Sequence, residues 1–429
     1  MYLLTTPIFA TLGVLPFYYE LLWFLEFFAF LPLLVNRSFK NFLLFGLVFT
    51  SLLYMPFLKA FYLTAGGWLL AVLTFAVFVL TFTLLQFGIS YLLTRIGVPF
   101  PLSYTAVEVL RLFVPFGGFP YEYLGKVLVN APFLGLSLHY LTVFGGTLFI
   151  LTVNWLLYKA LEQWELKGRR YLLTAFGIFL IPLLLSFIYK LELQIPRYGI
   201  KVALVQPFLF QSDKLTNGVF VKLYTTYLVW QTPKSADLVV LPETSISSEG
   251  GIYNFAKAFK DKNLLFGALW VFYDFSKLDL FAQNLAVLTL KGKIEGIYAK
   301  RFLVPFGEYT PKGFSFLGRV LPYLNAPDYL AGKRETIFTF RGIKLYPLIC
   351  NEVYFPLWEK RDFDIGVVLS NDAWFSQIFA KRHLWEVKLR AIETGKVFIF
   401  VNNNGFSGAV YPDGTYMGLP FAKIQILEL

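Results

Sequence analysis

The chain has 429 residues, of which 57% are hydrophobic, 20% aromatic and only 15% charged. Soluble domains are about 25% charged, so this composition excludes a wholly soluble protein and also excludes intrinsic disorder. The net charge of +11 indicates attraction to anionic lipid rather than to nucleic acid, because the polar part has no basic stripe interleaved with aromatic residues.

The charged residues are unevenly distributed along the chain. The first 195 residues contain 18 of them and the remaining 234 contain 47. We therefore expect a helical membrane bundle over 1–195 and a globular domain over 196–429. A membrane-spanning helix needs ~20 apolar residues. Seven apolar segments are candidate spans, near 2–15, 17–35, 41–58, 67–94, 101–114, 136–158 and 171–189.

The basic residues of the loops predict the orientation of the bundle, because Lys and Arg are enriched on the cytoplasmic side. With the N-terminus in the cytoplasm, seven basic residues lie inside and three outside. The seven are Arg37, Lys40, Arg95, Lys159, Lys167, Arg169 and Arg170. An odd number of spans then places the chain from residue 191 onward outside the cytoplasm.

Four charged residues, Glu20, Glu26, Glu108 and Arg111, fall inside or at the edge of predicted spans, where charges are costly and are candidates for a function. Glu108 and Arg111 are three residues apart, so they lie one helical turn from each other. A structural pair that braces the bundle is favoured over a direct substrate role, because mutual pairing is the usual way in which such charges are tolerated.

From residue 199 onward the chain consists of short apolar runs bounded by turn or polar residues, as buried strands are. The runs lie at 200–205, 238–241, 264–269, 285–290, 345–349, 365–369 and 397–401. Helical stretches near 215–230, 252–260 and 379–395 lie between some of them. Strands mixed with helices predict an α/β domain whose sheets are covered by helices.

Three chemically distinctive residues, Glu243, Lys300 and Cys350, follow strands of this domain. Strand ends in layered α/β folds are where catalytic groups are usually presented. A thiol needs a base, a developing oxyanion needs a positive donor, and these residues supply a thiol, a carboxylate and an ammonium group. Taken singly, each also has a structural explanation: a small buried hydrophobe, a turn acid or a surface charge.

The counts of cysteine and histidine limit the other kinds of chemistry. Cys350 is the single cysteine, so an internal disulfide framework and a site with several thiolates are excluded. The two histidines, His139 and His383, exclude a histidine-rich metal site. We therefore expect no metal ion and no cofactor, and a carboxylate rather than a histidine as the base.

Short strings in both parts of the chain match one known family. They are EVLR (108–111), GGFPY (117–121), VALVQP (202–207), VVLPETSI (239–246), YAKRFLVPFGEYTP (298–311), ICNEVYF (349–355), LSNDAWF (369–375), HLWEVKLRAIETG (383–395), NNGFSG (403–408) and YPDG (411–414). The polar part resembles the nitrilase superfamily, whose Glu–Lys–Cys triad sits in an αββα sandwich. The whole chain is similar to the apolipoprotein N-acyltransferase family, in which that domain follows a membrane bundle. The string LVPFGEY separates this family from soluble nitrilases.

The resemblance implies transfer of a fatty acyl chain from a phospholipid to the N-terminal amine of a diacylglyceryl-cysteine apolipoprotein. The family works in the bacterial inner membrane with its catalytic domain facing the periplasm. The resemblance makes Glu243 the base, Cys350 the nucleophile that forms a thioester, and Lys300 with the Asn351 N–H the oxyanion donors.

Two further acids match family positions near the triad. Glu308 braces Lys300 or acts directly on the substrate, and Glu352 orients the same cluster. The chain departs from the family at Asn351, where a Tyr is usual, and at Leu215, where an aromatic residue usually follows the early Lys. The family's usual further C-terminal span does not appear in this sequence.

Two alternatives come from other classes of protein. A membrane-tethered nitrilase-type amidase would hydrolyse a small amide with the same triad, but the bundle and LVPFGEY disfavour it. A transporter or receptor is disfavoured by the scarcity of polar residues within the spans. For acyl transfer from phospholipid, we expect the apolar segment 312–330 to form an interfacial arm that dips into the outer leaflet beside the site. Its apolar side chains are Phe314, Phe316, Leu317, Val320, Leu321 and Tyr323.

Overall fold

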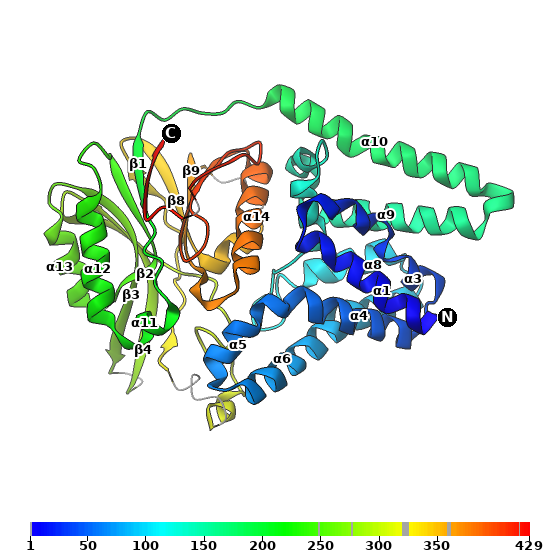
Figure 1. Ribbon diagram of the computed structural model, residues 1–429, viewed down its shortest axis with the longest axis horizontal. Helices are drawn as coiled ribbons and strands as arrows, with labels where there is room; N and C mark the ends of the chain where they lie inside the picture. Colours follow the sequence, from blue (N-terminus) through cyan, green and yellow to red (C-terminus); the bar gives the residue numbers. More distant parts are fainter. Residues whose placement is uncertain (1, 248, 276–277, 320–325, 358–361, 420) are drawn as a thin grey trace. The chain divides into compact units, whose positions relative to one another are not determined.

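The computed structural model describes residues 2–247, 249–275, 278–319, 326–357, 362–419 and 421–429. The chain divides into two compact units (Figure 1). The first contains residues 1–62 and 67–193, and the second contains residues 63–66 and 194–429.

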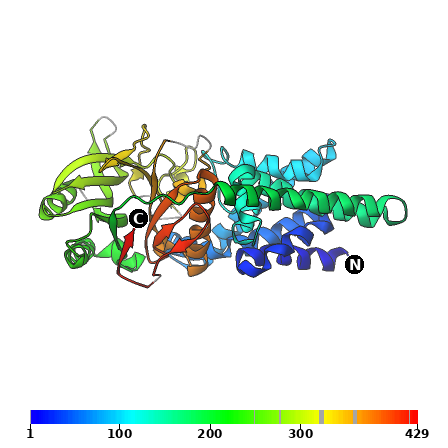
Figure 2. The same cartoon turned by 90° about the horizontal axis from the view of Figure 1, so that it is seen from above.

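Within the described residues, four helical stretches are long and apolar enough to cross a membrane. They are Phe39–Ala65, Trp68–Arg95, Gly135–Glu162 and Trp164–Glu192. The elements that build them are α4 (Phe39–Tyr54), α5 (Leu58–Ala65), α6 (Trp68–Thr83), α7 (Ile89–Arg95), α9 (Leu138–Glu162) and α10 (Arg169–Glu192). The long helices α9 and α10 pack against each other (Figure 1 and Figure 2). The protein is therefore a multi-pass membrane protein.

The other three predicted spans are shorter or broken. Helix α1 (Tyr2–Val14) has 13 residues and α8 (Phe100–Leu110) has 11. The segment near 17–35 is divided into a 3₁₀ helix (Glu20–Leu25), α2 (Glu26–Ala29) and α3 (Leu31–Val35). None of these reaches the ~20 residues of a simple span, so the count of seven spans stays a prediction.

Glu108 and Arg111 are both buried in the first unit, and their hydrogen bonds run to different partners. Glu108 accepts from the Leu124 N–H at 2.7 Å and from the Thr147 hydroxyl at 2.6 Å. Arg111 donates to Gln86 Oε1 at 3.2 Å and to the Tyr54 hydroxyl at 3.1 Å, and also to the Tyr121 carbonyl. Each charge therefore braces separate segments of the bundle.

The second unit contains two sheets among its described residues. The first has the order β13-β1-β2-β3-β4-β5, with β6 beside β4, and the second has the order β12-β11-β10-β9-β8-β7. The strands are β1 (Lys201–Val205), β2 (Leu238–Ser247), β3 (Asn263–Asp274), β4 (Asp279–Leu290), β5 (Lys293–Ala299), β6 (Asp328–Tyr329), β7 (Phe338–Phe340), β8 (Ile343–Ile349), β9 (Ile365–Asn371), β10 (Val397–Asn403), β11 (Gly408–Val410), β12 (Tyr416–Met417) and β13 (Ile424–Glu428). The last strand, β13, was not predicted and pairs antiparallel with β1.

Both faces of each sheet are covered, which explains the continuous apolar runs of the sequence. Successive residues of a strand point to opposite faces. Val202 therefore joins the core between the two sheets, whereas Ala203 joins the core beneath the helices.

Three helices cover the outer faces of the sandwich. Helices α12 (Gly218–Gln231) and α13 (Glu249–Ala258) lie on the first sheet, and α14 (Gln377–Thr394) lies on the second (Figure 1). This is the αββα arrangement, so the expected fold of a helical membrane part followed by a nitrilase-like sandwich is confirmed.

Candidate active site

Glu243 lies in β2 at a local break in the sheet. The pairing of β2 with β3 shifts register between Leu241 and Ile246, and Thr244 has a φ of 50°. A Cβ placed on the facing residue, Gly267, would lie 2.5 Å from the Glu243 Cα, so only glycine allows this close approach. The break turns the strand at Glu243 and holds its side chain in a mostly buried position.

Lys300 follows β5 directly and lies between two carboxylates. Its Nζ donates to Glu308 Oε1 at 2.8 Å and lies 3.8 Å from Glu243 Oε1. The other oxygen of Glu308 accepts from the Val304 N–H at 2.8 Å, which fixes the turn of the string LVPFGEY. Glu308 therefore holds the Lys300 ammonium, and its role in catalysis stays a prediction.

Asn284, in β4, was not singled out from the sequence. Its side-chain amide donates to Glu243 Oε1 at 2.6 Å and to Glu308 Oε1 at 3.3 Å, and its backbone carbonyl accepts from the Lys300 N–H at 2.8 Å. It thus contacts three residues of the cluster. The signal in the sequence was weak, because it consisted of one Asn directly before the apolar run 285–290. Only the structure shows that this Asn is buried.

Cys350 follows β8 and is the first residue of a 3₁₀ turn over Cys350–Tyr354. It is partly buried and has a φ of 51°, which is uncommon for a residue other than glycine. Such strained conformations cluster at functional sites, where they hold a side chain in a defined direction.

Glu352 ties the Cys350 turn to the segment that follows Lys300. One carboxylate oxygen accepts from the Ile349 N–H at 2.8 Å. The other accepts from the Tyr298 hydroxyl and from the Arg301 N–H, both at 2.7 Å. This buried carboxylate therefore positions the two segments relative to each other.

Asn351 is buried and connects to the same region. Its side-chain amide donates to the Phe302 carbonyl at 3.1 Å. Its Oδ1 has no hydrogen-bond partner among the described residues. The backbone N–H of Asn351 remains part of the turn that carries the thiol.

Electrostatic interactions couple the thiol, the ammonium and the carboxylates. Burial raises the pKa of Glu243 above its ordinary value, although Lys300 opposes the rise. Burial also raises the pKa of the Cys350 thiol, and the negative charge of Glu243 raises it further. Burial alone lowers the pKa of Lys300, but the charges of Glu308 and Glu243 outweigh burial and raise it. These shifts keep the Cys350 thiol protonated and the Lys300 side chain charged. The part that Glu243 plays toward the thiol stays a prediction.

A second lysine, Lys214, contacts the main chain at Glu243. Its Nζ donates to the Glu243 carbonyl at 3.0 Å and to the Thr244 hydroxyl at 2.7 Å. Burial lowers the pKa of Lys214 to about 8, although the charge of Glu243 opposes this. Lys214 thus supports the strained turn after Glu243 and places another positive charge near its carboxylate.

The predicted arm is only partly described. Phe314 packs edge-on against Phe306, and Phe316 is 60% exposed. Val320, Leu321 and Tyr323 lie outside the described residues. The exposed Phe316 is compatible with an interfacial arm, which stays a prediction.

No three His, Cys, Asp or Glu side chains come together to hold a metal ion within the ranges that the structure describes. The chemistry available at the cluster is that of a thiol, a carboxylate base and positive donors, which suits nucleophilic attack on a carbonyl carbon.

Two family models match the chain. The apolipoprotein N-acyltransferase N-terminal domain matches residues 8–156, and the carbon–nitrogen hydrolase model matches residues 270–422. An apolipoprotein N-acyltransferase of Aquifex aeolicus is 34% identical over 347 residues, which cover 78% of this chain and 77% of the relative. One of Sinorhizobium medicae is 30% identical over 338 residues, covering 72% of this chain and 62% of the relative.

Solved structures with a similar fold also exist. A CN-hydrolase superfamily protein from Xanthomonas campestris has a TM-score of 0.42 and 17% identity, covering 54% of this chain and 90% of its own. Nit3 of Saccharomyces cerevisiae, a member of the nitrilase superfamily, has a TM-score of 0.39 and 18% identity, covering 54% of this chain and 89% of its own.

Proposed function

Because the chain belongs to the apolipoprotein N-acyltransferase family, we propose that it transfers a fatty acyl chain from a phospholipid to the N-terminal amine of a diacylglyceryl-cysteine apolipoprotein. The observation that carries the proposal is the position of Lys300 between Glu308 and Glu243, next to the Cys350 turn that Glu352 holds.

In the first half-reaction, Glu243 takes the thiol proton while Cys350 Sγ attacks the sn-1 ester carbonyl of the phospholipid. Lys300 Nζ and the Asn351 N–H stabilise the negative charge that develops on the carbonyl oxygen. The ester C–O bond then breaks, and Glu243 returns the proton to the leaving sn-1 oxygen. The products are a lysophospholipid and a thioester on Cys350.

In the second half-reaction, the amine of the apolipoprotein attacks the thioester carbonyl. Glu243 accepts a proton from the attacking nitrogen, and the same donors stabilise the oxyanion. The C–S bond breaks, an amide forms, and the proton returns to Cys350. The raised pKa of Glu243 suits both steps, because a carboxylate with a higher pKa is a stronger base.

An amidase with the same triad would use water as its second nucleophile. The match of residues 8–156 to the N-terminal domain of the acyltransferase family does not favour that alternative. The decisive measurement is intact-mass analysis of the purified protein after mixing with phospholipid alone. We expect a mass increase of one fatty acyl group on Cys350.

Addition of a diacylglyceryl lipopeptide should then remove the adduct and add the acyl group to the peptide amine. Release of free fatty acid without peptide acylation would instead indicate a hydrolase. Absence of any adduct would contradict the thioester mechanism.

We also propose that the second unit lies on the periplasmic side of a bacterial inner membrane. The support is the excess of basic residues in the loops assigned to the cytoplasm. An alkaline-phosphatase fusion after Leu429 should be active, and a green-fluorescent fusion at the same place should be dark. The opposite pair of results would reverse the orientation.

A further inference from the structure

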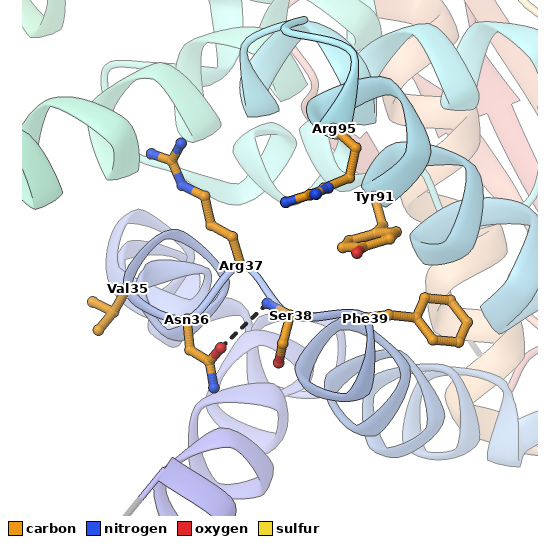
Figure 3. A pocket seen from close by; sticks show the side chains of 7 residues that line it. All are labelled: Val35, Asn36, Arg37, Ser38, Phe39, Tyr91 and Arg95. Atoms are coloured by element: carbon orange, nitrogen blue, oxygen red, sulfur yellow. Dashed lines mark hydrogen bonds between the residues drawn. The ribbon is translucent and has the colours of Figure 1, made fainter.

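A cavity of about 610 Å³ opens in the first unit (Figure 3). None of its lining residues belongs to the thiol cluster. It is lined by Val35, Asn36, Arg37, Ser38, Phe39, Tyr91 and Arg95. The lining combines two cations and several hydroxyl or amide groups with exposed apolar side chains. Val35 is 50% exposed and Phe39 is 42% exposed.

The two arginines come from different elements. Arg37 precedes α4 and Arg95 is the last residue of α7, with Tyr91 beside it (Figure 3). Arg37 Nε donates to the Leu34 carbonyl at 3.3 Å, and its guanidinium lies 5.8 Å from the centre of the Tyr158 ring. Among the described residues, neither arginine has a carboxylate within ion-pair distance.

An acid near Arg37 already has other partners. Glu162 is bound by Lys159 Nζ at 2.5 Å and by the Tyr158 hydroxyl. Arg37 and Arg95 are both exposed residues, and no acid of the described part of the chain forms an ion pair with either guanidinium group. A planar guanidinium matches the oxygens of a phosphate group.

The position of the cavity along the helices favours a lipid as the source of that phosphate. The membrane-length stretch Phe39–Ala65 leads away from Arg37, and the following stretch, Trp68–Arg95, returns to Arg95. Two consecutive spans start and end on one side of a membrane, so both arginines lie at the same membrane surface. Basic cavities between membrane helices at the membrane surface bind anionic lipid head groups.

We propose that this cavity binds the phosphate of an anionic phospholipid in the adjoining leaflet. Arg37 and Arg95 contact the phosphate oxygens, and Ser38 and Tyr91 offer hydroxyl groups. Ser38 also caps the first turn of α4, whose positive end adds to the attraction. The exposed side chains of Val35 and Phe39 contact the lipid tails. The site is independent of the proposed acyl transfer, because it shares no residue with the thiol cluster.

The test measures lipid binding to the full-length protein in detergent by native mass spectrometry. The probes are phosphatidylglycerol, phosphatidylcholine and water-soluble glycerol phosphate. The wild type should retain phosphatidylglycerol in preference to phosphatidylcholine. The double variant Arg37→Gln, Arg95→Gln should bind phosphatidylglycerol at least about tenfold more weakly, because each cation near the surface contributes appreciably to binding.

The matched control is Lys40→Gln, Lys167→Gln, which removes two exposed cations that do not line the cavity. It should bind phosphatidylglycerol like the wild type. If the arginine double variant does not fold, Arg95→Glu alone carries the test, because Arg95 is exposed and should lose the lipid without disturbing the fold.

Three results would overturn the proposal. One is undiminished phosphatidylglycerol binding by the arginine variants. Another is an equal loss in the lysine control, which would indicate only a diffuse surface charge. The third is arginine-dependent binding of glycerol phosphate as tight as that of the lipid, which would indicate a site for a soluble phosphate.

Discussion

Asn284 donates a hydrogen bond of 2.6 Å to Glu243 Oε1, across two strands that are not neighbours in the sheet. The same amide reaches Glu308 at 3.3 Å, so one neutral side chain keeps two carboxylates oriented around Lys300. Hydrogen bonds of this kind fix the direction in which a base presents its free oxygen.

The first prediction concerns this amide. Asn284→Leu should lower kcat by about 100-fold, because a misplaced catalytic group costs on this order. The control is Thr289→Val, a buried change in the same strand outside the cluster, which should leave kcat unchanged. Steady-state acylation of a lipopeptide checks both. Equal losses in the two variants would show that Asn284 only supports the fold.

The second prediction is a shift in pH dependence. The charge of Lys214 lowers the pKa of Glu243, so Lys214→Met should raise that pKa and move the acidic limb of kcat/KM to higher pH. The pKa of Lys214 is itself about 8, so Lys214 loses its charge as the pH rises through that value. The difference in kcat/KM between variant and wild type should therefore narrow over the same pH range. Lys222→Met, on the exposed face of α12, is the control. A limb that does not move would show that Lys214 acts only through its hydrogen bonds.

A third prediction concerns the close approach at Gly267. The Cβ of Gly267→Ala would lie 2.5 Å from both the Glu243 Cα and the Pro242 carbonyl, so the strand must shift. We expect a loss of about 1–3 kcal/mol in the free energy of unfolding, as for other overpacked positions, together with reduced kcat. Gly218→Ala meets no atom within 4 Å and should be neutral in both measurements. Normal activity with Gly267→Ala would mean that Glu243 tolerates displacement.

The fourth prediction tests the nucleophile. Cys350→Ser should abolish acyl transfer and the acyl adduct, because a hydroxyl is far less acidic than a thiol and a carboxylate does not ionise it. The variant should fold normally, since the two side chains differ by one atom. Intact-mass analysis checks the loss of the acyl adduct, and thermal unfolding checks that the variant folds normally. Near-normal transfer would contradict the assignment of Cys350.

The fifth prediction tests the arm. Phe316→Asp with Leu317→Asp should reduce transfer from phospholipid in membranes, because charges at the exposed Phe316 and the half-buried Leu317 oppose contact with the bilayer. Cys350 should still react with a small soluble thiol reagent. Loss of that reactivity in parallel would show that the arm is part of the core.

Much of the fold could be predicted from the sequence, because its physical causes are local. The scarcity of charge before residue 195 and the apolar runs after it already separate membrane helices from buried strands. Glu243, Lys300 and Cys350 stand out by residue type and by their place after strands, and the string LVPFGEY indicates the family.

The tertiary structure alone revealed what depends on distant segments. Asn284 and Glu243 are 41 residues apart, and no sequence pattern within either strand predicts the hydrogen bond between their side chains. The same is true of Gly267, which matters only because it faces Glu243, and of Arg37 and Arg95, which share a cavity only once two spans pack. Local patterns determine which elements form, whereas the register and packing between elements decide which side chains meet.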